Sequence, residues 1–163
     1  VADDARRDRV VGRDRLAVAQ HAVFCYGKGT PVADIKDGTS NTIALGERTV
    51  LDAHVADPSK WPSWCGPGGL GIGSTVSSSV AERLNHPSNM HAFSSHHSGG
   101  SQFCFVDGSV HFIDDSIDSR TGGLDPGNTS NPADFTNVAA QGNAGAYQLL
   151  GVRDDQQPIP LKL

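Results

Sequence analysis

The chain has 163 residues, the length of one compact domain, and a formal net charge of −5. Its 19 glycines and nine prolines, and the fact that 16 of its 18 acidic residues are Asp, favour strands and turns over long helices. The negative charge argues against a nucleic-acid partner, and no apolar run reaches the roughly 20 residues that cross a bilayer.

The first 21 residues form a charged segment. Residues 1–15 hold five Arg and four Asp in mixed order, which is typical of a solvated helix face or a frayed terminus. These two possibilities leave the order of residues 1–21 open. The start, which has neither a methionine nor an apolar leader, indicates a processed chain.

Two short elements are expected next. Val32–Asp37 fits a single helical turn that ends at Gly38, and Thr42–Glu47 (TIALGE) fits a strand. The residues between them indicate a tight reversal at Asp37-Gly38, with Gly38 at positive φ. A phosphate-binding loop is the alternative, but the Gly-Lys-Ser/Thr sequence of such loops is missing and Lys36 is the one lysine nearby.

A loop rich in Gly and Pro occupies Pro58–Gly73 and carries Trp61 and Trp64. We expect the two indoles to cover the core, although two tryptophans three residues apart also suit a platform that stacks on sugars. Ser74–Ser79 is polar and fits either a loop or an edge strand.

Gln102–Ile113 (QFCFVDGSVHFI) predicts a β-hairpin. Two alternating runs flank Asp107-Gly108, a pair that suits a two-residue type I′ turn because both of its positions need positive φ. The pairs that this turn implies are Phe105 with Val110 and Phe103 with Phe112 on the core face, and Cys104 with His111 on the other.

The rest of the chain is expected to be loop-rich. Asp114–Pro132 indicates a long surface loop, Ala144–Leu150 a short helix stopped by Gly151, and the two prolines of Gln156–Leu163 confine any strand there to an edge. The prediction is one α+β domain over residues 1–163, an antiparallel sheet with short helices and long loops.

Two stretches resemble the signature blocks of a known family. Ala33–Glu47 (ADIKDGTSNTIALGE) and Phe93–Ile113 (FSSHHSGGSQFCFVDGSVHFI) are similar to the blocks of a planctomycete-type, prepilin-like domain of unknown function named for its H-x9-DG motif. Here the motif is His97, nine residues, and Asp107-Gly108. Ala146–Arg153 (AYQLLGVR) is similar to the family's ending, so the resemblance spans about residues 22–153 and leaves 1–21 unmatched.

The resemblance implies a type IV pilin-like or pseudopilin-like protein, with a hydrophobic N-terminal helix followed by a globular head on an antiparallel sheet. The cleavage motif and the apolar helix are not in this sequence. We therefore expect a head domain separated from its anchor.

His97 and Asp107 allow a catalytic interpretation and a structural one. As catalytic groups they would be a base and its orienting carboxylate, with Ser94, Ser95 or Ser40 as nucleophile. As structural groups, Asp107-Gly108 is the hairpin turn and His97 ends the approach to it. We favour the structural interpretation because a turn already explains Asp and Gly, and the sequence contains no G-x-S-x-G.

The clustered histidines and the Asp-rich loop raise the possibility of a metal ion, zinc or calcium. Zinc is disfavoured because the spacing of the clustered histidines places them on different faces of a helix or strand, so that only His96 or His97 with His111 could converge. Calcium suits the Asp-rich loop better than zinc does, but no EF-hand pattern is present, so we favour solvated turn carboxylates over a calcium site. The histidines are His86, His91, His96, His97 and His111, and the calcium candidates are Asp114, Asp115, Asp118 and Asp125.

The cysteines leave the redox compartment open. Cys25, Cys65 and Cys104 fit one disulfide with a free thiol, or three free thiols.

The function expected from this sequence is structural. We expect a non-catalytic subunit of a pilus-like or type II secretion-like filament in the cell envelope or outside the cell, with no cofactor. Its partners would be other pilin-like subunits, copies of itself or envelope proteins, and it would meet the membrane only through the N-terminal helix. The alternative is an envelope module that binds a glycan or calcium through the Trp61/Trp64 loop or the Asp-rich loop.

Overall fold

The computed structural model describes residues 22–24, 29–49, 80, 82–87, 92–123 and 137–159. Within these residues no helix is long and apolar enough to cross a membrane. Several predictions lie outside the described residues, namely those on segment 1–21, the loop 58–73 with Trp61 and Trp64, segment 74–79, and the side chains of Cys25, Cys65, His91 and Asp125.

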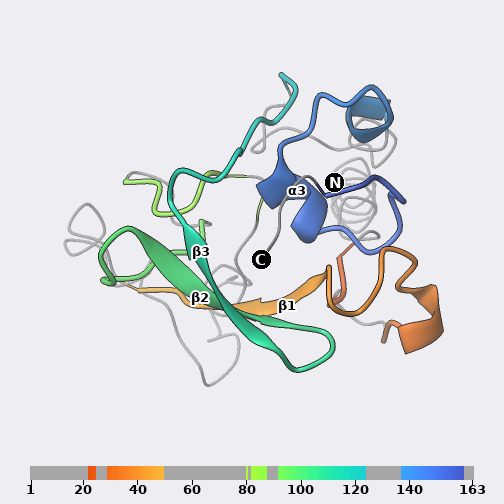
Figure 1. Cartoon of the computed structure of the whole chain (residues 1–163), viewed down its shortest axis with the longest axis horizontal. Helices are drawn as coiled ribbons and strands as arrows, with labels where there is room; N and C mark the ends of the chain where they lie inside the picture. Colours follow the sequence, from red (N-terminus) through yellow and green to blue (C-terminus); the bar gives the residue numbers. More distant parts are fainter. Residues whose placement is uncertain are drawn as a thin grey trace, which may run out of the picture.

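The centre of the fold is an antiparallel sheet of three strands in the order β1-β2-β3 (Figure 1). Strand β1 is Ile43–Gly46, β2 is Gly100–Phe105 and β3 is Val110–Asp114. The sheet and the short helices beside it make a small α+β fold, as the sequence predicts.

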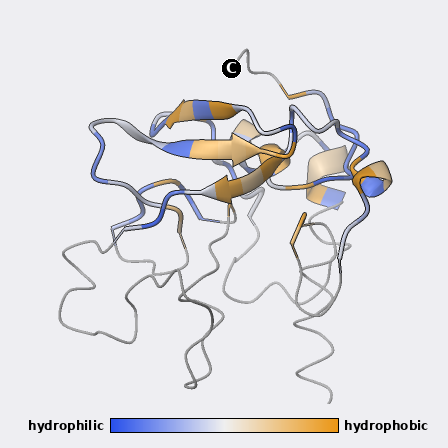
Figure 2. Cartoon of the chain, turned by 90° about the horizontal axis from the view of Figure 1, so that it is seen from below, coloured by the Kyte–Doolittle hydropathy of each residue, from blue (hydrophilic) through white to orange (hydrophobic). Residues whose placement is uncertain are grey.

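The hydrophobic core lies on one face of the sheet. Phe103 and Phe105 of β2 are buried there, and helix α3 (Ala146–Leu150) packs against them with all five of its residues buried. The rings of Phe103 and Tyr147 meet edge to face with centroids 6.0 Å apart. In Figure 2 the strands and α3 carry hydrophobic stretches that are interrupted by hydrophilic residues, and much of the connecting backbone is hydrophilic.

The hairpin between β2 and β3 is confirmed, but the predicted type I′ turn is wrong. Phe103 pairs with His111 and Cys104 with Val110, one residue away from the expected register. The loop has three residues: the Phe105 carbonyl accepts the Gly108 N–H at 3.0 Å, and the Phe105 N–H bonds to the Ser109 carbonyl at 2.9 Å. Only Gly108 of these has positive φ (+86°), which suits a type I turn followed by a left-handed glycine.

The shifted register moves every β3 side chain to the face opposite the predicted one. Val110 and Phe112, expected in the core, are exposed, while Ile113 is buried and the His111 ring packs edge to face on Phe105 at 5.1 Å. The core positions predicted for Phe103 and Phe105 are confirmed.

The short elements elsewhere are close to the predictions. The turn expected at 32–37 is a 3-10 helix, η2 (Val32–Asp34), and Gly38 has the expected positive φ of +94°. The helix expected at 144–150 is α3, with Gly151 at its C-cap. Gly151 has φ −88°, so its role is close packing: a Cβ there would collide with the side chain of Val80.

The loop after the hairpin was predicted to begin at Asp114 but begins one residue later, because β3 continues through Asp114. The described part of the tail Gln156–Leu163, residues 156–159, contains no strand.

Candidate functional site

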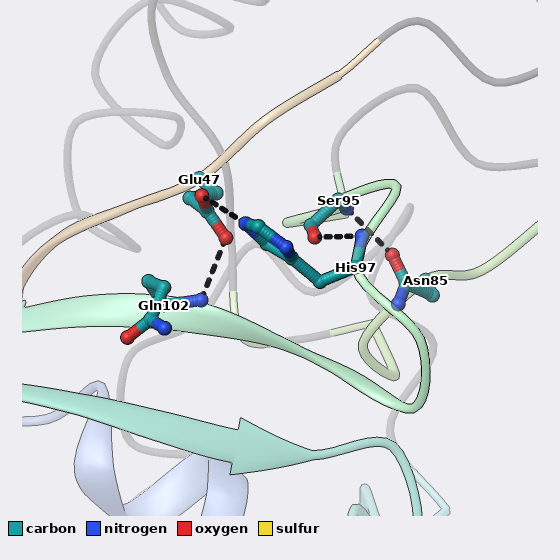
Figure 3. Close-up of polar contacts among 5 residues, drawn as sticks. All are labelled: Glu47, Asn85, Ser95, His97 and Gln102. Carbon is teal, nitrogen blue, oxygen red and sulfur yellow. Dashed lines mark hydrogen bonds and ion pairs between the residues drawn. The ribbon is translucent and has the colours of Figure 1, made fainter.

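The end of β1 and the start of β2 bring Glu47 and His97 together. Because the strands are antiparallel, the residue after β1 lies beside the segment that leads into β2, and the Glu47 N–H donates to the Gln102 carbonyl at 3.2 Å. Glu47 Oε1 lies 3.2 Å from His97 Nε2, and Glu47 Oε2 accepts the Gln102 N–H at 2.7 Å (Figure 3). One carboxylate therefore binds both the histidine and the β2 backbone.

The loop that carries His97 is fixed by side chains. Ser95 Oγ accepts the His97 N–H at 2.8 Å, and Asn85 Oδ1 accepts the Ser95 N–H at 2.8 Å (Figure 3). Asn85 itself has φ +53°, a conformation that Asn tolerates better than most residues, and its amide Nδ2 donates to Asp115 Oδ1 at 2.8 Å. Asn85 thus joins the segment before β2 to the end of β3.

An open pocket of about 450 Å³ adjoins this pair, lined by Glu47, Arg48, Thr49 and Ser94–His97. The side chains of His97 and Glu47 are 57% and 37% exposed, so water reaches their contact. Burial lowers the pKa of the Arg48 guanidinium. The pocket is therefore open to solvent beside the contact between His97 and Glu47.

The hydroxyls proposed as nucleophiles are engaged elsewhere or lie apart from the imidazole. Ser94 Oγ donates to the Thr49 carbonyl at 3.2 Å and accepts the Thr49 N–H at 3.1 Å. Ser95 Oγ faces the His97 backbone, and Ser40 lies before β1, at the opposite end of that strand from Glu47. The geometry therefore pairs His97 with a carboxylate but not with a nucleophile.

The pairing of His97 with Asp107, considered from the sequence, is wrong. The two residues flank β2, whose six residues separate them by about 20 Å at ~3.3 Å per residue. The carboxylate partner of His97 is Glu47, which was not among the residues predicted for a site. A signal existed: Glu47 is one of only two glutamates and closes the first signature block.

Asp107 caps its own turn. Its Oδ1 accepts the Ser109 hydroxyl at 2.6 Å and the Ser109 N–H at 2.9 Å, and these bonds lower the pKa of the carboxyl. The backbone N–H of Asp107 donates to the Thr39 carbonyl at 3.1 Å, and that of Val106 donates to the Thr42 carbonyl at 3.0 Å. The tip of the hairpin therefore binds the reversal of the first signature block.

Asp37 binds a segment that is far away in the sequence. Its two carboxylate oxygens accept the backbone N–H groups of Asp155 at 3.0 Å and Gln156 at 2.6 Å, while the Arg153 carbonyl accepts the N–H groups of Lys36 and Asp37. Asp37-Gly38 is a reversal, as predicted, but the contact with the tail was missed. Nothing local in the sequence identifies a contact across 118 residues.

The calcium candidates within the described residues each have a local partner. Asp114 Oδ1 accepts the Ser116 N–H, Asp115 bonds to Asn85, and Asp118 pairs with Arg120 at 2.8 Å. His97 contacts Glu47 at the end of β1, whereas His111 belongs to β3. The two histidines therefore lie on opposite sides of β2. Across the described ranges, no three His, Cys, Asp or Glu side chains are grouped to hold a metal ion. Cys104 has a free thiol.

Comparison with known proteins yields one match. A family model described as "Protein of unknown function (DUF1559)" matches residues 5–120, well over half of the chain. The match includes both signature blocks and, contrary to our expectation, most of segment 1–21, whereas the similar ending at 146–153 lies beyond it. No curated protein and no solved structure matches.

Proposed function

The chain belongs to the family of proteins of unknown function DUF1559, and on this premise we propose that it is a non-catalytic assembly subunit of a pilus-like or type II secretion-like filament in the cell envelope. Its partners would be other pilin-like subunits, and its membrane contact a hydrophobic helix preceding this chain in the full-length protein. The resemblance of the two blocks to prepilin-like domains motivates the proposal.

One observation carries the non-catalytic part: the polar side chains of the signature residues bond to groups of the protein itself. Asp37 holds the tail, Asp107 caps the hairpin turn, and His97 meets Glu47, which in turn bonds to the β2 backbone. A family signature made of such contacts supports a rigid body that presents its surface to partners. An enzyme's signature would instead point its polar groups at a substrate.

The filament role is tested on the full-length protein in its own cells. Antibodies raised against this domain should decorate filaments in electron micrographs, and shearing should release the protein in multimers. Its gene should encode an apolar helix of about 20 residues upstream of Val1. A full-length protein found only as monomers in the unsheared cell extract, with no such helix, would rule the role out.

His97→Ala separates the structural from the catalytic interpretation. The structural role predicts a lower melting temperature for His97→Ala, and a smaller decrease in melting temperature for Glu47→Gln. If His97→Ala melted like the wild type but abolished a hydrolytic activity measured on a panel of ester and glycoside substrates, the protein would be an enzyme.

The alternative, a calcium-binding envelope module, has its own test. A native-state ligand raises the melting temperature by mass action, so calcium should stabilise the protein and a chelator should reverse the effect. A melting temperature unchanged by either would remove the calcium alternative.

A further inference from the structure

Arg153 lies where three segments of the described chain meet. Its carbonyl accepts the backbone N–H groups of Lys36 at 2.6 Å and Asp37 at 3.1 Å, and its Nη1 donates to the Ala22 carbonyl at 2.7 Å. The last contact spans 131 residues. One residue therefore holds the first signature block through its backbone, and the chain that precedes this block through its side chain.

The guanidinium of Arg153 is enclosed by the protein. The side chain is 15% exposed, and the carboxylate of the adjacent Asp154 lies 3.9 Å from Nη2, which is beyond hydrogen-bonding distance. Its short bond is the one to the Ala22 carbonyl, and a hydrogen bond from a charged donor is stronger than one between neutral groups. Arg120 differs, because its side chain is 63% exposed and pairs with Asp118, two residues away.

Residues 22–24 have few other contacts that could fix them on the domain. Phe24 is 68% exposed, and Ala22 and Val23 are only half-buried. Within the described ranges, no hydrogen bond other than the one from Arg153 reaches these three residues. The position of residues 22–24 on the domain therefore depends on the Arg153 side chain.

The segment that carries Arg153 is itself fixed on both sides. Helix α3, which precedes it, is buried in the core, and the N–H groups of Asp155 and Gln156, which follow it, bond to the Asp37 carboxylate. Gln156 has φ +55°, an uncommon conformation for a residue with a side chain, which persists where the surrounding structure determines it. The Arg153 side chain thus links Ala22 to a rigid base.

We propose that Arg153 is a positioning residue that fixes the direction in which the chain enters the domain. Because its backbone is held to the core and its side chain to Ala22, the entering chain cannot turn independently of the sheet. A consequence for assembly rests on the filament role proposed above: the head would keep one orientation relative to the helix that precedes it.

Pulsed electron paramagnetic resonance tests the positioning directly. In a chain with its native cysteines replaced by serine, and shown to melt cooperatively, nitroxide labels at Phe24→Cys and Val110→Cys report the distance from the entering segment to β3, since both positions are exposed. With Arg153 present, the distance distribution should be a single narrow peak. In Arg153→Met, which keeps a long side chain but has no donor, the distribution should become about twofold wider or more.

Two controls separate the side chain of Arg153 from its backbone. Labels at Val32→Cys, also exposed, and Val110→Cys should give the same distribution in Arg153→Met as in the wild type, because the Arg153 carbonyl still accepts its two N–H groups. Arg120→Met should leave both distributions unchanged. The proposal would be overturned by a 24/110 distribution that Arg153→Met does not widen, or by equal widening for the two pairs of labels.

The consequence for assembly is tested separately, in the full-length protein in its own cells. Arg153→Met should cause a loss of filaments in electron micrographs at an unchanged amount of protein, and Arg120→Met should cause none. Wild-type numbers of filaments in Arg153→Met would contradict this consequence. Absence of filaments from the wild type would instead refute the proposed function, and the distance measurements would still decide whether Arg153 positions the entering chain.

Discussion

The two Asp-Gly pairs of this protein look alike in sequence, but their aspartates bind different parts of the chain. Gly38 and Gly108 both take positive φ, +94° and +86°, and both follow an aspartate. Asp37 accepts two backbone N–H groups from a segment 118 and 119 residues away, whereas Asp107 accepts its bonds from Ser109, two residues on. The two glycines share a positive φ, but only one of the two aspartates holds distant parts of the chain together.

This difference separates local from global stabilisation. A carboxylate that caps its own turn bonds to residues that stay close to it in the unfolded chain, so the bond can form there too and favours the folded state less. A carboxylate that binds a distant segment closes a long loop, and its removal leaves two backbone donors without their partner. How much an Asp-Gly pair contributes to the free energy of unfolding therefore depends on where the pair lies in the fold.

The largest effect is expected from Asp37→Ala. Loss of an acceptor shared by two backbone N–H groups should lower the free energy of unfolding by about 2–3 kcal/mol, which is about 4–12 °C in melting temperature. Urea unfolding of the wild type, of Asp37→Ala and of the matched variant Asp107→Ala measures this loss. Equal decreases in the free energy of unfolding for the two variants would show that the two aspartates do not differ.

Equal effects are expected from the two glycines. Gly38→Ala and Gly108→Ala should each cost about 1–2 kcal/mol, because each forces an alanine into a left-handed conformation while its Cβ meets no close neighbour. Thermal melts measure both. If Gly38→Ala lost much more stability than Gly108→Ala, the two turns would differ in the strain of their backbones and not only in the partners of their aspartates.

Glu47 provides an intermediate case, a carboxylate that spans 55 residues to Gln102 and 50 to His97. Glu47→Ala should cost about 1–2 kcal/mol through the lost bond to the backbone. Glu47→Gln keeps an acceptor and should cost less than about 1 kcal/mol, since the contact with His97 is solvent-exposed. Losses of the same size in both variants would mean that the charge, and not the backbone bond, matters.

The smallest effect is expected from Asp107→Asn, and it should depend on pH. Hydrogen bonds from Ser109 hold the pKa of Asp107 below its ordinary value, so the stability it contributes is present above about pH 4 and is lost as the pH falls through the lowered pKa. Wild type and variant should therefore converge under acid conditions. A difference in melting temperature that is larger at pH 3 than at pH 7 would contradict this sign.

Much of the fold follows from local sequence, because strands and turns depend on neighbouring residues. The hairpin, the strand after the first reversal and the helix before Gly151 were all predicted. The register of the hairpin was not, because Asp-Gly suits both a type I′ turn and a three-residue loop, and the one-residue difference reverses the faces of Val110 and Phe112.

The candidate site was only half predictable. His97 and Asp107 were identified as signature residues, but their true partners, Glu47 and Ser109, depend on how β1 aligns with β2 and on the turn geometry. The bonds from Asp37 to the tail need the folded chain. Contacts over 50 to 118 residues have no periodic pattern that a single sequence reveals.

Amide hydrogen exchange of Asp155 and Gln156 tests most directly whether a signature aspartate holds the fold together. We expect both amides to be protected in the wild type and in Asp107→Ala, and to exchange at least tenfold faster in Asp37→Ala, while the β2 amides stay protected. Unchanged protection of both amides in Asp37→Ala would contradict the account.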